Sequence, residues 1–375
     1  MIRMAAAALS ALLILSAAPV QAGAASRPSR DPFFQRWEYH DRTRGLPSDK
    51  VFAVAVDGPR VWAGTEDGLA LLEKGSVRVF GTNDGLPFPA VTALAVHPET
   101  GDLWIGTMGG LARLSGGRID AFTQLDSGRA NNVVYGVAVD GPDVWVATAA
   151  GLNRLDTRGM TWEIFDTSNT LMQEPWCYGI STAGGVVYVA VWGSGLLVHD
   201  PDSGTFRIHR DPDGEMEIDL FRDDGLVHDV TSAVDFAGGT LWIGTYFGLS
   251  RYDGRRWNSY NDEDSGLAGN FINFVRARED VVWIATDQGL SRFDSRTWHT
   301  WRQAASGNGF ELRETDASNR HRRLGASGGP ASNTIYGIDL QDDDIWLATA
   351  AGLSHGIARK PPPSHPTTGQ GDADE

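Results

Sequence analysis

The 375-residue sequence contains a single cysteine, Cys177. One cysteine excludes an internal disulfide, and a chain that is 41% hydrophobic can bury a core large enough to fold without one. We expect this lone thiol to be buried rather than reactive. Lysine and arginine are also scarce: 32 of them face 48 acidic residues, which leaves a formal net charge of -16. Such a field repels phosphate backbones, so nucleic acid is excluded as an expected partner.

Long hydrophobic runs are absent as well. The apolar run Ala5–Ala17 is shorter than the ~20 residues that a membrane-spanning helix needs. It follows the positive charge of Arg3 and precedes small-residue cleavage patterns ending at Ala22 or Ala25, which is the arrangement of a cleavable signal peptide. We therefore expect residues 1–25 to be removed and the mature protein to be soluble, without a membrane span, and periplasmic or secreted.

Motifs of metal and nucleophile chemistry are missing or out of context. The nine histidines include no HExxH and no pair at metal-ligand spacing. The pattern G-x-S-x-G at Gly325–Gly329 lies in a Gly/Ser-rich stretch, whereas a nucleophile elbow needs a strand before it and a helix after it. The acidic turns Asp211–Glu215 and Asp342–Asp344 do not form a twelve-residue calcium loop. We expect no metal, no cofactor and no catalytic residue.

What the sequence does contain is one phrase repeated seven times. Its clearest copy is LWIGTYFGLSR at Leu241–Arg251, and the other copies begin at Val61, Leu103, Val144, Val187, Val282 and Ile345. The threonines of the first three copies, Thr65, Thr107 and Thr148, are 42 and 41 residues apart. Two longer steps mark insertions, one within about 209–229 and one within about 303–333.

Each unit has the pattern of four short antiparallel strands. In the first unit these are Val51–Val56, Val61–Thr65, Leu69–Leu72 and Val77–Phe80, separated by turns that contain glycine. A glycine or alanine recurs in each second strand, beside a tryptophan in six of the seven units, which predicts close approach of a neighbouring sheet. A four-stranded unit that repeats every ~42 residues without helical periodicity is typical of a propeller blade.

The two ends of the chain complement each other. The seventh unit lacks a fourth strand, and Phe34–His40 (FQRWEYH) has the pattern of a fourth strand without a blade before it. Pairing the two hides two sheet edges. We therefore predict an all-β, seven-bladed β-propeller of four-stranded antiparallel blades over residues 26–358, with the ring closed by the N-terminal strand in the last blade. The Pro-rich and acidic residues 359–375 are expected to form a disordered tail.

The phrase LWIGTxxGLSRYDG, preceded by DGL and an apolar strand, resembles the two-component regulator propeller repeat. That family forms the periplasmic sensing part of hybrid histidine kinases, which respond to external ligands, often glycans. The resemblance covers almost all of the expected mature chain and implies a sensor-like propeller. The immunoglobulin-like domain, membrane helix and kinase that usually follow have no counterpart in this sequence, so we expect a stand-alone binding module.

Candidate ligand-binding residues lie in the loops that lead into each first strand. In a propeller these loops share a face with the turns between the second and third strands, and both insertions fall among them, which is expected to enlarge that face. The polar candidates two residues before each strand are Asn132, Asp229, Asn270 and Asn333, and the aromatic candidates just inside the strands are Tyr135, Tyr178 and Tyr336. They could stack on and hydrogen-bond a sugar or another polar ligand. Alternatively, Asp and Asn cap the bends and the tyrosines pack between blades.

The fourth unit departs most from the repeat. Val191 replaces threonine, and the following turn gains a residue and contains Trp192. Trp176 and Tyr178 lead into the first strand of the same unit, and Tyr246 occupies the equivalent turn of the next unit. Functional residues often lie where a local rule fails, so these aromatic residues are the strongest candidates; repacking within the blade is the alternative.

These features predict a non-catalytic module that binds a small polar ligand or an envelope protein, with a sensor kinase or surface complex as a possible partner. The first alternative is a propeller enzyme, a lyase or hydrolase acting on a glycan or cyclic peptide, and its candidate residues would be His228 and Asp229. The second is a scaffold of an envelope or cell-surface complex. The basic cluster Arg320–Arg323 could dock an acidic partner, although on so acidic a chain a solvated loop is the favoured explanation.

Overall fold

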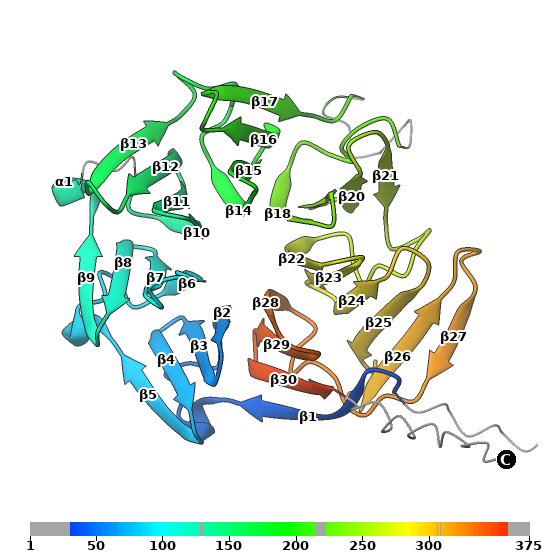
Figure 1. The fold of residues 1–375 in the computed structure, drawn as a ribbon. Helices are drawn as coiled ribbons and strands as arrows, with labels where there is room; N and C mark the ends of the chain where they lie inside the picture. The colour runs from blue at the N-terminus through cyan, green and yellow to red at the C-terminus, as the bar shows by residue number, and fades with distance from the viewer. Residues whose placement is uncertain are drawn as a thin grey trace, which may run out of the picture.

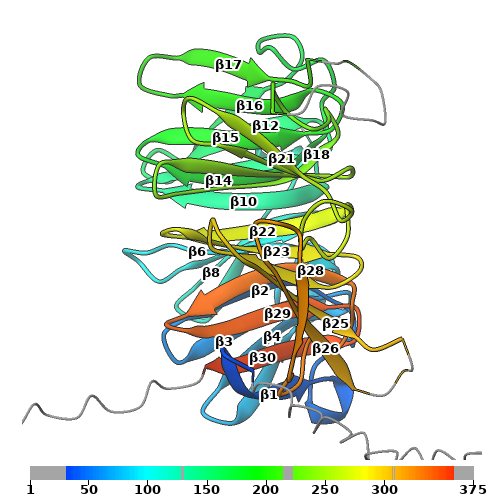
Figure 2. The same ribbon diagram turned by 90° about the vertical axis from the view of Figure 1, so that its right-hand side faces the viewer.

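The computed structural model describes residues 31–127, 131–212, 214, 223–305, 307 and 309–358, which form seven sheets around a central axis (Figure 1). Six of these sheets contain four antiparallel strands and one contains six. Viewed edge-on, the ring is a disc with its blades side by side (Figure 2). The predicted seven-bladed propeller of four-stranded blades is therefore confirmed, with one blade enlarged. The expected signal peptide, 1–25, and tail, 359–375, lie outside the described residues.

The first four blades follow one another along the chain. Blade 1 contains β2 (Val51–Asp57), β3 (Arg60–Thr65), β4 (Gly68–Glu73) and β5 (Ser76–Phe80). Blade 2 contains β6 (Val91–Val96), β7 (Leu103–Thr107), β8 (Gly110–Ser115) and β9 (Arg118–Phe122). Blade 3 contains β10 (Val134–Asp140), β11 (Asp143–Thr148), β12 (Gly151–Asp156) and β13 (Thr161–Phe165). Blade 4 contains β14 (Cys177–Ala183), β15 (Val186–Val191), β16 (Gly195–Asp200) and β17 (Thr205–His209).

The last three blades complete the ring. Blade 5 contains β18 (Thr231–Ala237), β19 (Thr240–Thr245), β20 (Leu249–Tyr252) and β21 (Trp257–Tyr260). Blade 6 contains β22 (Ile272–Arg278), β23 (Val281–Thr286), β24 (Leu290–Phe293), β25 (Trp298–Gln303), β26 (Phe310–Thr315) and β27 (His321–Leu324). Blade 7 contains β28 (Ile335–Gln341), β29 (Asp344–Thr349), β30 (Gly352–Ala358) and β1 (Phe34–His40). Short helices lie between strands at Arg42–Arg44, Thr82–Asp84 and Gln124–Ser127 (α1).

Strand β1 is the outer strand of blade 7, although it opens the described chain. It pairs antiparallel with β30, so that Trp37 lies opposite Gly356 and Tyr39 opposite Ser354. The two ends of the described fold therefore share one sheet. Strand β30 is paired on both sides, with β1 and with β29, and so is not an exposed edge strand.

The sequence suggested that the second insertion enlarges the face that carries the loops between blades. The structure differs. The residues of this insertion form β26 and β27, which extend blade 6 outward beyond β25 (Figure 1). The expectation was wrong because β26 pairs with β25, where Leu312 lies opposite Trp301 and is fully buried. Of the first insertion, residues 213 and 215–222 lie outside the described part of the chain.

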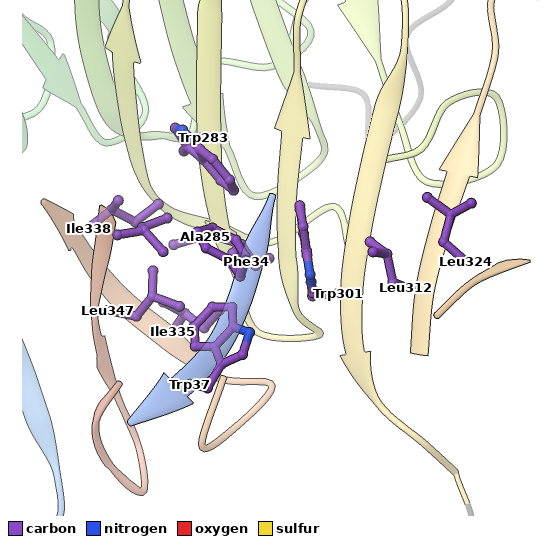
Figure 3. Packing of buried hydrophobic residues seen from close by; sticks show 12 residues of the cluster. Phe34, Trp37, Trp283, Ala285, Trp301, Leu312, Leu324, Ile335, Ile338 and Leu347 are labelled. Carbon is purple, nitrogen blue, oxygen red and sulfur yellow. The ribbon is translucent and has the colours of Figure 1, made fainter. Parts of the chain in front are cut away.

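The enlarged blade holds the N-terminal strand in place. Phe34 and Trp37 of β1 pack with Trp283 and Trp301 of blade 6, and the ring centroids of Phe34 and Trp301 are 5.7 Å apart (Figure 3). Ser327, the serine of the G-x-S-x-G pattern, donates its hydroxyl to the carbonyl oxygen of Phe34 at 2.9 Å. This segment therefore anchors β1, which is a structural role for a motif that can also signal a nucleophile.

The threonine of the repeat fixes the turn between the second and third strands. Thr107 Oγ1 donates to the carbonyl oxygen of Gly110 at 2.7 Å, and the same bond recurs in every blade except blade 4. In blade 4, where Val191 stands in place of threonine, the next blade supplies the hydroxyl: Thr231 Oγ1 donates to Gly195 O at 2.8 Å. A hydrogen bond from blade 5 thus stabilises the irregular turn that contains Trp192.

The small residue beside each tryptophan lies where two blades meet, as the repeat predicted. A Cβ at Gly244 would lie 2.4 Å from Cγ2 of Ile272, the first residue of β22 in the next blade. A Cβ at Gly106 would lie 2.6 Å from Val134 Cγ1, at the corresponding junction. The predicted burial of Cys177 is also confirmed, and this burial raises the pKa of its thiol. Among the described residues, no helix has the length and apolar character needed to cross a membrane.

Candidate functional site

The first strands of the seven blades surround a central channel of about 680 Å³. They are β2, β6, β10, β14, β18, β22 and β28 (Figure 1). A volume of this size lies within the range of roughly 300–1,000 Å³ found for small-molecule sites. We call the face with the loops that lead into these strands the upper face, and the channel opening there the mouth.

The channel has three chemical layers because the seven strands share one register. At the mouth, the second residues of the strands are Phe52, Thr92, Tyr135, Tyr178, Ser232, Asn273 and Tyr336. The fourth residues form an aliphatic layer of Val54, Leu94, Val137, Ile180, Val234, Val275 and Ile338. The fifth residues are alanine in blades 1–3 and Ser181, Asp235, Arg276 and Asp339 in blades 4–7. Three residues of strand separate the mouth from this charged layer by roughly 10 Å.

The non-aromatic polar residues of the mouth bind neighbouring blades. Thr92 Oγ1 donates to the carbonyl oxygen of Val134 at 2.6 Å, and Ser232 Oγ donates to that of Ile272 at 2.5 Å. Asn273 Nδ2 donates to the carbonyl oxygen of Ile335 at 2.9 Å. Each acceptor is the first residue of the next blade's inner strand, so these side chains serve blade-to-blade contact.

Five aromatic residues form a continuous row on the upper face, and two of them, Tyr135 and Tyr178, line the channel. Its members, which we call the aromatic row, are Tyr135, Tyr178, Trp192, Tyr246 and Phe271. The centroid distances between successive rings are 4.6, 5.7, 4.8 and 3.6 Å. The row crosses blades 3–6, and the structure thus brings together four of the aromatic residues that the sequence had singled out.

The other aromatic candidates lie near the row or across the channel. Trp176 is 44% exposed, and its carbonyl oxygen accepts the N–H of Trp192 at 2.9 Å. Tyr336 lies across the mouth in blade 7, with its ring centroid 5.6 Å from that of Phe52. Sequence reasoning missed Phe271, which occupies the position of Trp176 two blades further on. Alignment of the residue before each first strand was the signal that could have identified it.

The phenols of Tyr178 and Tyr246 are neutral at ordinary pH. Burial, reinforced by the neighbouring Tyr135 and Tyr246, raises the pKa of Tyr178 to about 12. Burial also raises the pKa of Tyr246 above its usual value. These two residues therefore offer uncharged ring faces and hydroxyl donors rather than phenolate anions.

The Asp and Asn candidates brace the loops of the upper face. Each Oδ1 accepts a backbone N–H from a loop residue. Asn132 accepts from Gln124 at 2.6 Å, and Asp229 accepts from Asp211 at 2.8 Å. Asn270 accepts from Asp262 at 2.9 Å, and Asn333 accepts from Gln303 at 2.7 Å. This is the bend-capping chemistry that was the alternative to ligand binding.

The histidine named for the enzyme alternative lies in a packed environment. His228 is 8% exposed, its Nδ1 accepts the N–H of Val230 at 2.9 Å, and its ring centroid is 4.1 Å from that of Phe247. The adjacent carboxylate of Asp229 is directed to a loop N–H. These contacts give both residues structural roles in the loop between blades 4 and 5.

The charged layer of the channel links blades 4–7 to one another and to blade 1. Asp235 Oδ1 accepts the hydroxyl of Ser181 at 2.9 Å, and its Oδ2 accepts the N–H of Ala277 at 2.8 Å. Asp339 Oδ2 accepts the N–H of Val56 at 2.7 Å, while its Oδ1 lies 3.6 Å from Nη2 of Arg276. These carboxylates occupy inner-strand edges that would otherwise present unpaired N–H groups to the channel. Sequence reasoning missed this layer, although charged residues within apolar strands were a visible signal.

No protein-family model and no curated protein matches the sequence. Solved structures do. The extracellular domain of BT3049, assigned to a hybrid two component system of B. thetaiotaomicron, matches with a TM-score of 0.63 and 16% identity, over 86% of this chain and 42% of that chain. The extracellular domain of BT4673 from B. thetaiotaomicron matches with a TM-score of 0.63 and 18% identity, over 86% and 40%.

This chain shares the propeller fold of those extracellular domains. It spans about two fifths of the length of either neighbour. BamB from Moraxella catarrhalis is a more distant match, with a TM-score of 0.52 and 12% identity over 86% of this chain and 96% of that one. At these identities the likeness concerns the fold, which is the one that the two-component regulator propeller repeat implied.

Proposed function

We propose that this propeller is a non-catalytic, sensor-like binding module that takes a small polar ligand on the aromatic row at the mouth of its channel. The observation that carries the proposal is the row itself, five rings in successive contact across four blades. Ring faces stack on ligand rings, and the tyrosine hydroxyls donate hydrogen bonds, which suits a sugar or another polar ligand.

The blade scaffold does not need the rings of Trp192 and Tyr246. In every blade the first residue of the turn after the second strand donates its N–H to the carbonyl oxygen of the residue before the first strand. Trp192 and Tyr246 make this bond in blades 4 and 5, and Met108, Ala149 and Ala350 make it in blades 2, 3 and 7. Since alanine satisfies the turn, the aromatic residues are free to serve a ligand.

Exposed apolar side chains also concentrate on the upper face. Of the seven large hydrophobic residues that are exposed in the described part of the chain, five lie in its loops and turns: Phe88, Met108, Leu125, Leu171 and Trp176. Exposed apolar residues that gather on one face mark a surface for a ligand or a protein partner. For the loops outside the mouth we propose a protein partner, either a sensor kinase or another envelope protein. The proposed location of the protein is periplasmic or extracellular.

Replacing Trp192 with alanine is expected to weaken ligand binding about tenfold, because a desolvated ring contact contributes up to roughly 1.5 kcal/mol. A thermal-shift panel of neutral oligosaccharides, choline, spermidine and arginine identifies the ligand, since a compound that binds only the folded state raises Tm. Titration calorimetry then compares the wild type with Trp192→Ala. Trp257→Ala, at a half-buried position in the outer strand β21, is the matched control and should bind normally. Equal affinity for the wild type and Trp192→Ala would place the ligand elsewhere.

A further inference from the structure

The aromatic row ends at a carboxylate. Asp287 occupies the turn between β23 and β24, the position that Trp192 and Tyr246 hold in the two preceding blades. Its N–H donates to the carbonyl oxygen of Phe271, the last ring of the row, at 3.3 Å. Three successive blades therefore present an indole, a phenol and a carboxylate at one level of the upper face.

No cation in the described residues forms an ion pair with Asp287. Partial burial raises the pKa of its carboxyl group, and the nearby Asp262 raises it further. The equivalent turn residue of blade 1 has a different environment, because Glu66 Oε1 lies 3.9 Å from Nζ of Lys50. Of these two carboxylates at equivalent positions, the one without a cation is the one that adjoins the aromatic row.

The channel itself is acidic. Its charged lining residues in the described structure are Asp235, Arg276 and Asp339, which sum to one negative charge. The mouth also shows that its rings accommodate a cation, since the ammonium of Lys50 lies 5.1 Å from the centroid of Phe52. On a chain with a formal charge of -16, this field favours a positive ligand over a negative one.

We propose that the ligand of the mouth is an organic cation, an ammonium or guanidinium compound whose charge pairs with Asp287 and whose carbon skeleton lies over Tyr246 and Trp192. This inference rests on the proposed function and specifies its ligand class. The rings attract the cation through the negative faces of their π-systems. A neutral sugar would stack on the same rings but would not depend on the charge at Asp287.

The test is titration calorimetry of the full propeller with choline, spermidine and arginine, and with maltohexaose as a neutral probe. For a cation that binds, Asp287→Asn should weaken the affinity about three- to fivefold, as expected for a solvent-accessible ion pair. The variant should also reduce the dependence of the affinity on salt concentration. Glu66→Gln is the matched control, because it neutralises the equivalent turn residue away from the aromatic row, and it should leave the affinity within twofold of the wild type.

The outcomes separate this inference from the proposed function. Maltohexaose that binds through Trp192 and is indifferent to Asp287→Asn would overturn the cationic ligand and keep the binding role of the row. Failure of all three cations to bind at millimolar concentration would also overturn the cationic ligand. Binding of a cation that is unaffected by Trp192→Ala would contradict both proposals, because the ligand would then lie away from the row.

Discussion

Replacing Trp301 with alanine is expected to lower the free energy of unfolding by about 3–5 kcal/mol, the cost of truncating a fully buried tryptophan. Trp301 has no exposed surface, and its ring lies 5.6 Å from that of Trp283 and 5.7 Å from that of Phe34. It is the point where blade 6, the inserted strand β26 and the N-terminal strand β1 meet (Figure 3). The truncation would leave a cavity between elements that cannot close it without separating β1 from the ring.

Urea denaturation measures this effect through the midpoint and slope of the transition. The matched control is Trp176→Ala, because Trp176 is 44% exposed and its truncation should change stability by no more than about 0.5 kcal/mol. A loss below about 1 kcal/mol for Trp301→Ala would mean that the junction of blade 6 and β1 contributes little to the fold.

Gly244→Val is expected to destabilise the propeller by about 2–3 kcal/mol through overpacking. A Cβ at this position already lies 2.4 Å from Ile272 Cγ2, and the branched side chain of valine would force blades 5 and 6 apart. Gly244→Ala should cost less than half as much, because blade 6 has the fully buried Ala285 at the same position beside the fully buried Ile335 of blade 7.

The two glycine variants are compared by the same urea titration, with calorimetric melting as a second measure. If valine and alanine destabilise equally, the cost arises from the backbone rather than from contact between blades. If neither variant changes the midpoint, the close approach inferred at this junction is incorrect.

The fold could be predicted because its essential chemistry repeats. Glycine, threonine and a small residue recur at the same places in successive units, where they form the turn, lock it through a hydroxyl and allow contact between blades. The two strands of the second insertion escaped prediction because they carry many charges, as in His321–Leu324, and because β26 is held to blade 6 through the burial of Leu312 against Trp301. Tertiary contact, rather than local pattern, decides such edge strands.

The candidate site could be predicted only in part. Tyr178 and Trp192 were identified in the unit that departs from the repeat, and Tyr246 at the equivalent turn of the next unit; the structure places their rings in sequence. Phe271 and Asp287 were missed because they lie in units that follow the repeat, so neither breaks a local rule. Their importance comes from contact between blades, which depends on the ring geometry and not on any single unit.

The central claim, that the mouth is the ligand site, is tested most directly by nuclear magnetic resonance of methyl-labelled methionine. Met108 is 38% exposed and lines the mouth, whereas Met160 is 45% exposed in the turn between β12 and β13 on the opposite face. A compound that raises Tm should shift the methyl resonance of Met108 and leave that of Met160 unchanged. A bound compound that shifts Met160 and not Met108 would contradict the account.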